Sequence, residues 1–282
     1  MTKKGNNIQV EHYLSTRDAI KKIRLSAETQ IKEELTTQSL VIKSIWEQGC
    51  TKYNNPWCKV LDALPRNLYS FATRYLSNSL ANGSNAVKWG IATSAKCLFC
   101  NETQTLQHVI SSCKTSLNEG RWNWRHDSIL INIARFLNKL PGVKVYCDVE
   151  NTEFLTPSII TGDEQRPDLV VIKDKSCKVL ELTVGFETNM LKNSQRKTER
   201  YKNLITRLAT NYNVEYFDLS MGGIGVICSE SKNLRKILVD LGLSTEESDY
   251  LVRKVINVCL RSTYYIFCRR NKNWEGPSLL AW

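Results

Sequence analysis

The chain has 282 residues, 42% of them hydrophobic, a length suited to about two domains with packed cores. Lys and Arg outnumber Asp and Glu 39 to 28, and the net charge of +11 favours a polyanionic partner. The sequence has no run of about 18 uncharged apolar residues, no signal-like apolar start and no densely basic amphipathic segment. We therefore expect a soluble intracellular protein without a membrane partner.

Residues 1–95 are predicted to be a helical linker or scaffold region. Apolar residues recur at helical spacing in 13–48 and, more clearly, in 66–80, which an Asn-Gly-Ser-Asn turn ends. Three bases near the start form a candidate phosphate-facing patch, although a solvated helix face explains them more simply: Lys21, Lys22 and Arg24. We predict no chemistry in this region.

Residues 96–124 contain the most specific local pattern, Cys97-x2-Cys100-x7-His108-x4-Cys113. Three thiolates and an imidazole at this spacing are typical of tetrahedral Zn²⁺ and leave no position for a catalytic water. The alternatives are a chance pattern, or three core cysteines near a surface His. The other seven cysteines are scattered through apolar segments, which fits a reducing compartment and a metal site better than a disulfide framework.

Residues 125–282 are predicted to form one α/β domain. Its first element is an amphipathic helix that begins with Arg125 and His126. A basic pair at a helix start is unfavourable for the helix dipole, so an anionic partner is expected there. The preceding Trp122 and Trp124 either stack on bases or pack the zinc segment onto its neighbour, and we prefer the packing.

A β-hairpin is predicted in 166–183, after a strand at 143–149 and a weaker one at 154–160. A turn near 175 places Asp168 almost opposite Glu181, with Cβ atoms about 5 Å apart. Two carboxylates so close repel each other unless a cation lies between them, and Mg²⁺ or Mn²⁺ is a natural occupant. A surface hairpin with two unrelated acids is the alternative.

The segment 188–212 is predicted to be one helix with a buried stripe that includes Tyr201. Lys197 lies one turn earlier on the same face, either as an active-site lysine or as a lysine at the rim of the stripe. Six bases and one acid between 192 and 207 suit a phosphate backbone, with Arg196 and Arg200 pointing outward.

The remaining chain completes a mixed sheet flanked by helices. Strands are predicted at 214–219 and 224–228, followed by a helix at 233–241. Ser244 begins a capping box that opens a long final helix. Between 251 and 273 this helix carries six bases and no acid, and we assign it no function.

These motifs together resemble the carboxy-terminal part of site-specific, early-branching non-LTR retrotransposon proteins. That part holds a CCHC zinc knuckle and a restriction-enzyme-like endonuclease of the PD-(D/E)xK class. The resemblance covers roughly residues 60–215. It rests on Leu64-Pro65-Arg66-Asn67, Asn85 with Trp89, the cysteine and histidine spacing, Arg125-His126-Asp127, Arg166-Pro167-Asp168 with Glu181, and Lys197 with Tyr201. Asp127 stands where the family has Asn, and Thr183 stands where the simple E-x-K pattern has Lys.

The resemblance implies a nuclear, metal-dependent endonuclease that nicks double-stranded target DNA and frees a 3′-hydroxyl for a linked reverse transcriptase. Asp168 and Glu181 would bind Mg²⁺ or Mn²⁺, while Lys197, with Lys202 as substitute, and Tyr201 would complete the catalytic group. Arg125, His126, Arg196, Arg200 and Lys202 are the expected nucleic-acid contacts. No Tyr/Phe-x-Asp-Asp polymerase motif occurs, so we expect a fragment or a stand-alone derivative that works with element RNA or a reverse transcriptase. The alternative is a catalytically inactive, zinc-dependent nucleic-acid-binding module.

Overall fold

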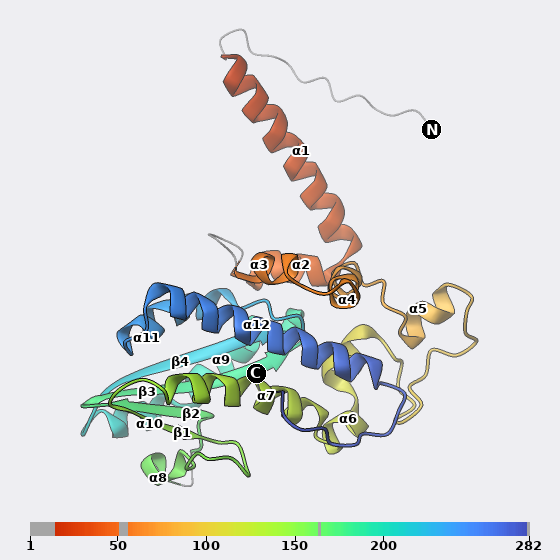
Figure 1. The fold of residues 1–282 in the computed structure, drawn as a ribbon. Helices are drawn as coiled ribbons and strands as arrows, with labels where there is room; N and C mark the ends of the chain where they lie inside the picture. The colour runs from red at the N-terminus through yellow and green to blue at the C-terminus, as the bar shows by residue number, and fades with distance from the viewer. Residues whose placement is uncertain (1–14, 51–55, 163–164, 281–282) are drawn as a thin grey trace.

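A computed structural model describes residues 15–50, 56–162 and 165–280 of the chain (Figure 1). The amino-terminal region is helical as predicted, although the predicted start at residue 13 lies outside the described residues. Its helices are α1(Thr16–Gln38), α2(Leu40–Gln48), α3(Pro56–Asp62), α4(Arg66–Leu76) and α5(Gly83–Lys88). The 13–48 segment is thus two helices, because Ser39 takes an extended conformation and caps α2 by accepting from the Ile42 N–H.

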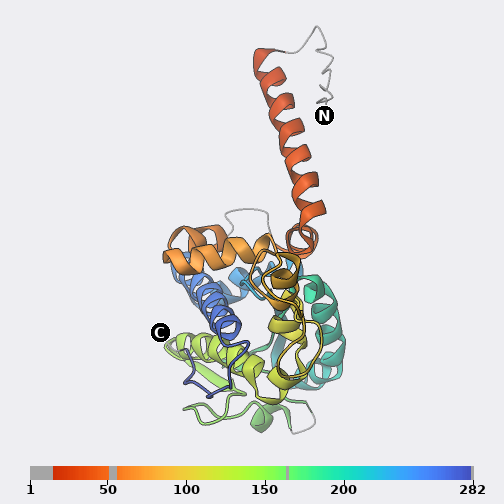
Figure 2. The same cartoon turned by 90° about the vertical axis from the view of Figure 1, so that its right-hand side faces the viewer.

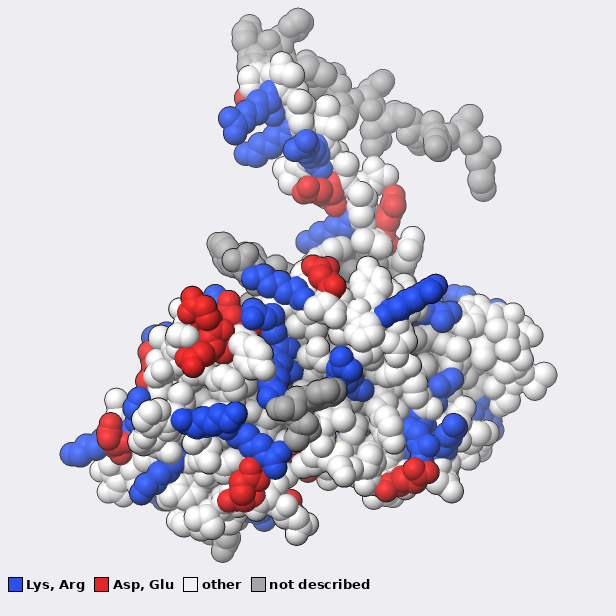
Figure 3. All heavy atoms as spheres, in the orientation of Figure 1, with Lys and Arg blue, Asp and Glu red and all other residues white. Residues whose placement is uncertain are grey.

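Helix α1 stands away from the rest of the molecule in both ribbon views (Figures 1 and 2). Ser15 caps its first turn by accepting from the Asp18 N–H, and none of its residues is buried. Both basic and acidic side chains appear on its surface (Figure 3). Ile20, Ile23 and Ile31 are exposed, so α1 contributes no buried residue to the core.

Helix α4 carries most of the buried stripe predicted over 66–80, but it ends at Leu76, and Asn82 in the predicted turn caps α5 instead. Leu68, Phe71, Ala72 and Tyr75 are all buried, because residues three and four apart share one face of a helix. The Phe71 ring packs edge-on against Tyr264 near the carboxy-terminal end, with 5.1 Å between ring centroids. The amino-terminal helices are therefore joined to the last part of the chain.

A four-stranded mixed sheet lies at the centre, with the strands in the order β1-β2-β3-β4. The strands are β1(Val143–Cys147), β2(Leu169–Lys173), β3(Ser176–Gly185) and β4(Asn213–Gly222). The first three are antiparallel neighbours, whereas β4 runs parallel to β3. A parallel pair needs a crossover, which α9(Met190–Arg200) and α10(Lys202–Leu208) supply after the short turn η2(Glu187–Asn189).

Helices cover both faces of this sheet (Figure 2). One face packs on α7(Arg121–Leu137), α11(Leu234–Asp240) and α12(Thr245–Cys268) through the largest hydrophobic cluster. The other face packs on α10 through a smaller cluster that includes Val179, Tyr201 and Leu204. Successive side chains of a strand point to opposite faces, so Glu181 shares the face of Val179. The α/β prediction of a mixed sheet flanked by helices is confirmed at this level.

Three predicted elements were wrong in detail. Residues 154–160 form no strand, because Pro157 begins the short helix α8(Ser158–Thr161) and only Leu155 bridges Tyr146. The helix predicted over 188–212 is divided at Tyr201, whose backbone (φ −97°, ψ 4°) ends α9. Residues 224–228 make isolated bridges rather than a strand, because Gly225 turns the chain tightly at φ +84° and η3(Ser229–Ser231) follows.

The final helix α12 begins with the predicted capping box. The Ser244 hydroxyl accepts from the Glu247 N–H at 3.2 Å, and Glu247 accepts from the Ser244 N–H at 2.8 Å. The helix ends at Cys268, so the last bases of the predicted segment lie beyond it. No helix in the described part of the chain is long and apolar enough to cross a membrane. All ten cysteines are free thiols.

Candidate metal centre and candidate active site

The four predicted zinc ligands come from a loop and two short helical turns. Cys97 and Cys100 lie in a tight loop that the Cys97 N–H closes on the Glu102 carbonyl at 2.7 Å. His108 begins the π-helical turn η1(His108–Ser112), and Cys113 is the residue before α6(Lys114–Asn118). The left-handed backbone of Asn101 (φ +62°) completes the loop, a conformation that Asn adopts more readily than most residues.

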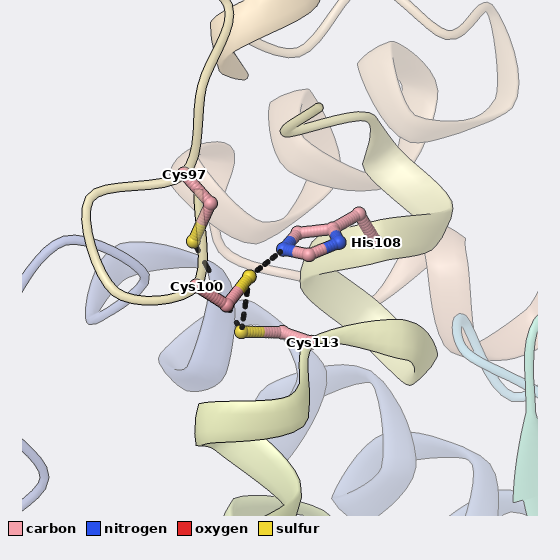
Figure 4. Close-up of side chains that lie close together, drawn as sticks. All are labelled: Cys97, Cys100, His108 and Cys113. Atoms are coloured by element: carbon pink, nitrogen blue, oxygen red, sulfur yellow. Dashed lines mark hydrogen bonds between the residues drawn. The ribbon is translucent and has the colours of Figure 1, made fainter. Parts of the chain in front are cut away.

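The four side chains converge on one point (Figure 4). Their ligand atoms all lie within 4.8 Å of one another, with Sγ–Sγ distances of 4.0 Å for Cys97–Cys113 and 3.8 Å for Cys100–Cys113. A tetrahedron with Zn–S bonds of about 2.3 Å has edges of about 3.8 Å, so the spacing fits zinc. Burial lowers the pKa of His108, which favours the neutral imidazole that a metal requires.

The knuckle is fixed to the carboxy-terminal segment by Arg121, whose side chain is fully buried. Its guanidinium donates to the carbonyls of Arg269 and Lys272 at 2.8 and 2.9 Å and lies over the rings of Phe99 and Trp274. Trp124, three residues later, donates to the Ser278 carbonyl at 3.1 Å. Trp124 is buried, which fits the packing role that we preferred for it, although the residues it contacts, Trp274 and Ser278, lie near the carboxy-terminal end.

A second cluster forms at the predicted hairpin, away from the zinc ligands. The register pairs Leu169 with Leu180, so Asp168 lies one step further along, opposite Glu181. The Asp168 N–H donates to Glu181 Oε2 at 3.2 Å, and the Leu182 N–H donates to Asp168 Oδ2 at 2.6 Å. The predicted hairpin is confirmed, and its geometry holds both carboxyl groups at one end of the β2–β3 pair.

Lys197 reaches this acidic pair from helix α9, where its ammonium forms an ion pair with Glu181. Lys202, the substitute, instead pairs with the exposed Glu199. Burial and the Asp168 carboxylate raise the pKa of Glu181, and Lys197 opposes this rise. Of the two candidate lysines, only Lys197 contacts the acidic pair.

Tyr201 is fully buried against the face of the sheet that the hairpin and β4 form. Its hydroxyl donates to the Arg166 carbonyl at 3.0 Å, two residues before Asp168. Burial, followed by the neighbouring Glu181 carboxylate, raises the pKa of Tyr201, which therefore stays protonated. This tyrosine joins α9 and α10 to the backbone segment that carries Asp168.

His126 completes the cluster from the first turns of α7. Its Nε2 lies 3.2 Å from Asp168 Oδ2 and its Nδ1 lies 2.9 Å from Asp127 Oδ1. Burial alone would lower the pKa of His126, but the Asp168 and Asp127 carboxylates raise it to about 10. Burial likewise favours protonated Asp168, and the His126 cation reverses this so that the pKa of Asp168 is lowered. His126, predicted as a nucleic-acid contact, thus sits against a candidate catalytic carboxylate.

The structure places Arg125 in the interior rather than at a nucleic-acid interface. The side chain is 1% exposed, and its guanidinium donates to the carbonyls of Ile110 and Val184 and to the Thr263 hydroxyl. A buried guanidinium has no access to a phosphate, so we remove Arg125 from the expected contacts. Arg196, Arg200 and Lys202 are exposed on α9 and α10, as a contact surface requires.

Replacing Arg125 by Met is expected to destabilise the fold by about 3 kcal/mol, because buried carbonyls lose their charged donor. The comparison is Arg135→Met on the same helix, where an exposed pair with Glu153 is worth about 1 kcal/mol or less. Urea unfolding of both variants measures the difference, and equal losses would contradict the interior role of Arg125.

Sequence reasoning missed Asp218, which the parallel register places beside Glu181 on β4. The side chain is buried, and its Oδ2 accepts from the Ser220 hydroxyl at 2.7 Å. Burial raises the pKa of Asp218, while Ser220, Ser194 and Lys197 act in the opposite direction. The available signal was Asp218 between the apolar residues Phe217 and Leu219, which becomes informative only once β4 is known to neighbour β3.

Among the described residues, only the Cys/His set brings three or more metal-ligand side chains together. Asp168 and Glu181 together offer two carboxylates, and Mg²⁺ is commonly bound by one or two carboxylates together with substrate phosphates. Neither a scan against protein-family models nor a search of curated proteins found a match. The fold and site therefore define an α/β protein with a mixed four-stranded sheet and a zinc-knuckle-like Cys/Cys/His/Cys group.

Proposed function

We propose that this protein is a metal-dependent DNA endonuclease that nicks one strand of double-stranded target DNA. The observation that carries the proposal is the convergence of Asp168, Glu181 and Lys197, which come from a hairpin and a separate helix. Metal-dependent phosphodiester hydrolysis uses carboxylates to hold the ion and a cationic side chain to stabilise charge on the phosphate, and these three side chains offer both. The basic composition and the exposed bases of α9 and α10 also suit a DNA substrate.

The two carboxylates are assigned to hold Mg²⁺ or Mn²⁺ at the end of the hairpin. Asp168 retains some solvent exposure, with 15% of its side chain accessible, whereas Glu181 lies almost fully buried behind it. A divalent ion bound there would polarise the scissile phosphate and lower the pKa of a bound water. His126 keeps Asp168 ionised, because its positive charge offsets the burial of the carboxylate.

Lys197 is assigned to donate hydrogen bonds to the phosphate as charge builds up on its oxygens. In the hydrolysis, a water oxygen bonds to phosphorus, the P–O3′ bond breaks and the 3′ oxygen takes up a proton. The products are a 5′-phosphate and a 3′-hydroxyl, the end that a linked reverse transcriptase would extend. Tyr201 is assigned to position the segment before Asp168 through its bond to the Arg166 carbonyl.

Lys197→Ala is expected to slow nicking by about 10²-fold or more, the usual cost of a lost transition-state donor. Lys202→Ala, which removes an equal charge from the same region without touching the acidic pair, is expected to retain near-normal cleavage. Single-turnover rates at saturating enzyme separate this loss from weaker DNA binding. Equal rates for Lys197→Ala and the wild type would exclude the lysine from the reaction.

Incubation of the protein with supercoiled plasmid, in Mg²⁺ or in EDTA, tests the proposal. Open circles that form only with the divalent ion support the nuclease, and binding without cleavage, on a plasmid that includes the target site, contradicts it. The second candidate is an inactive zinc-dependent nucleic-acid-binding module derived from a retrotransposon. It is favoured by the pairing of both acids with side-chain cations, Glu181 with Lys197 and Asp168 with His126, which balances their charge without a metal.

A further inference from the structure

A groove of about 360 Å³ lies between α3 and α12. We call it the α3/α12 groove, and its described lining residues come from those two helices and the loops beside them. They are Lys59, Val60, Ala63, Tyr250, Arg253, Lys254, Asn257, Val258 and Arg261. This is the part of the final helix whose excess of bases has no role in the proposed nuclease centre.

The groove is positively charged. Four of its described lining residues are basic and none is acidic: Lys59, Arg253, Lys254 and Arg261. Lys and Arg side chains gather over α3 and the middle of α12 on the face shown in Figure 3. Burial, together with repulsion from Lys139, lowers the pKa of Lys254, so a bound anion would relieve a crowding of like charges.

The groove also offers an apolar floor and an exposed ring. Val60 and Val258 are buried beneath it, whereas Tyr250 at one end is 53% exposed and packs on Phe136 with 6.0 Å between ring centroids. Arg253 and Arg261 lie eight residues apart on α12, about 12 Å along the helix axis. This length exceeds the spacing of neighbouring phosphates along one strand, so Arg253 and Arg261 can contact different phosphates of the same strand.

Helices α12 and α9 lie on opposite sides of the sheet (Figure 2). Helix α12 packs on the face that α7 covers, whereas Glu181 meets Lys197 from α9 on the other face. A nucleic-acid strand bound in the α3/α12 groove is therefore a different segment from the DNA at the acidic pair.

We propose that the α3/α12 groove binds a segment of single-stranded nucleic acid. Its phosphates lie along Lys59, Arg253 and Arg261, and one base stacks on the Tyr250 ring. Lys and Arg side chains beside an exposed aromatic ring are the usual elements of single-strand binding, because every nucleobase has a face that can stack on the ring. The inference is independent of cleavage.

Fluorescence anisotropy with single-stranded DNA and RNA oligonucleotides, in EDTA and over a range of salt, tests the charged part. Each phosphate contact contributes about 0.7 to the slope of log affinity against log salt. Lys59→Gln/Arg253→Gln is therefore expected to reduce the slope by about 1.4, whereas Lys144→Gln/Lys175→Gln, which removes two exposed bases elsewhere, leaves it unchanged. If the double variant unfolds at a lower temperature than the wild type, Lys59→Glu alone replaces it in this test.

The ring is tested at the same time. Tyr250→Leu is expected to weaken single-strand binding about 5-fold or more, and Tyr250→Phe to retain it, because stacking needs the ring but not the hydroxyl. A slope that is unchanged, or equally changed by both double variants, overturns the proposal. So does an equal loss with a duplex of the same sequence, or a loss seen with anionic vesicles and not with oligonucleotides.

Discussion

Replacing Asp168 or Glu181 by alanine is expected to abolish Mg²⁺-dependent nicking while zinc content and DNA affinity survive. Each substitution leaves one carboxylate at the hairpin end, so the ion loses one of its two protein ligands and is no longer held in the position that activates the water. Glu181 is almost fully buried beside Lys197, so Glu181→Gln, which keeps its shape, accompanies the alanine variant. Gel assays of plasmid nicking measure the loss.

The matched control for these variants is Asp174→Asn in the turn of the same hairpin. Asp174 is exposed, and its left-handed backbone (φ +53°) is one that Asn also adopts readily. Asp174→Asn removes one acidic side chain from the hairpin and leaves Asp168 and Glu181 unchanged, so cleavage should persist. Undiminished nicking by Asp168→Ala would remove the catalytic assignment.

Removal of zinc is expected to unfold residues 96–126 and to destabilise much of the protein. Structural zinc supplies about 10–16 kcal/mol of apparent binding free energy in small zinc modules, which is free energy of folding there. Leu106, Val109 and Ile110, between the ligands, belong to one hydrophobic cluster with Phe71 and Tyr75 of α4. Loss of the knuckle would therefore expose apolar surface well beyond the metal.

Thermal unfolding with and without a strong chelator, together with zinc analysis, measures this effect. Cys113→Ser is expected to lose the metal and to melt at a much lower temperature. Cys268→Ser, an exposed cysteine outside the cluster, should keep both the zinc and the melting temperature. A melting curve indifferent to chelators would show that the four side chains do not hold a structural ion.

The local parts of both sites were predictable from the sequence. The cysteine and histidine spacing is a property of one short segment, and the hairpin register follows from the turn position because side chains alternate along a strand. Lys197 was placed on the inward face of its helix by periodicity, and the structure indeed sets it against Glu181. Each inference needed only residues close together in the chain.

The remaining features depend on contacts between distant segments. Asp218 comes beside Glu181 only because β4 is parallel to β3, and His126 meets Asp168 across 42 residues. Arg125 resembled an exposed basic residue at a helix start, but its helix begins earlier, at Arg121, and its side chain is enclosed by α12 and η1. Periodicity within a segment does not reveal such neighbours.

Metal binding tests the central claim most directly, since it requires no knowledge of the DNA target. Electron paramagnetic resonance of Mn²⁺, titrated into zinc-loaded protein, counts the bound ion. We predict a site that Asp168→Asn/Glu181→Gln abolishes and Asp174→Asn retains. The same Mn²⁺ binding in the double variant as in the wild type, or none in either, would contradict an ion shared by the two carboxylates.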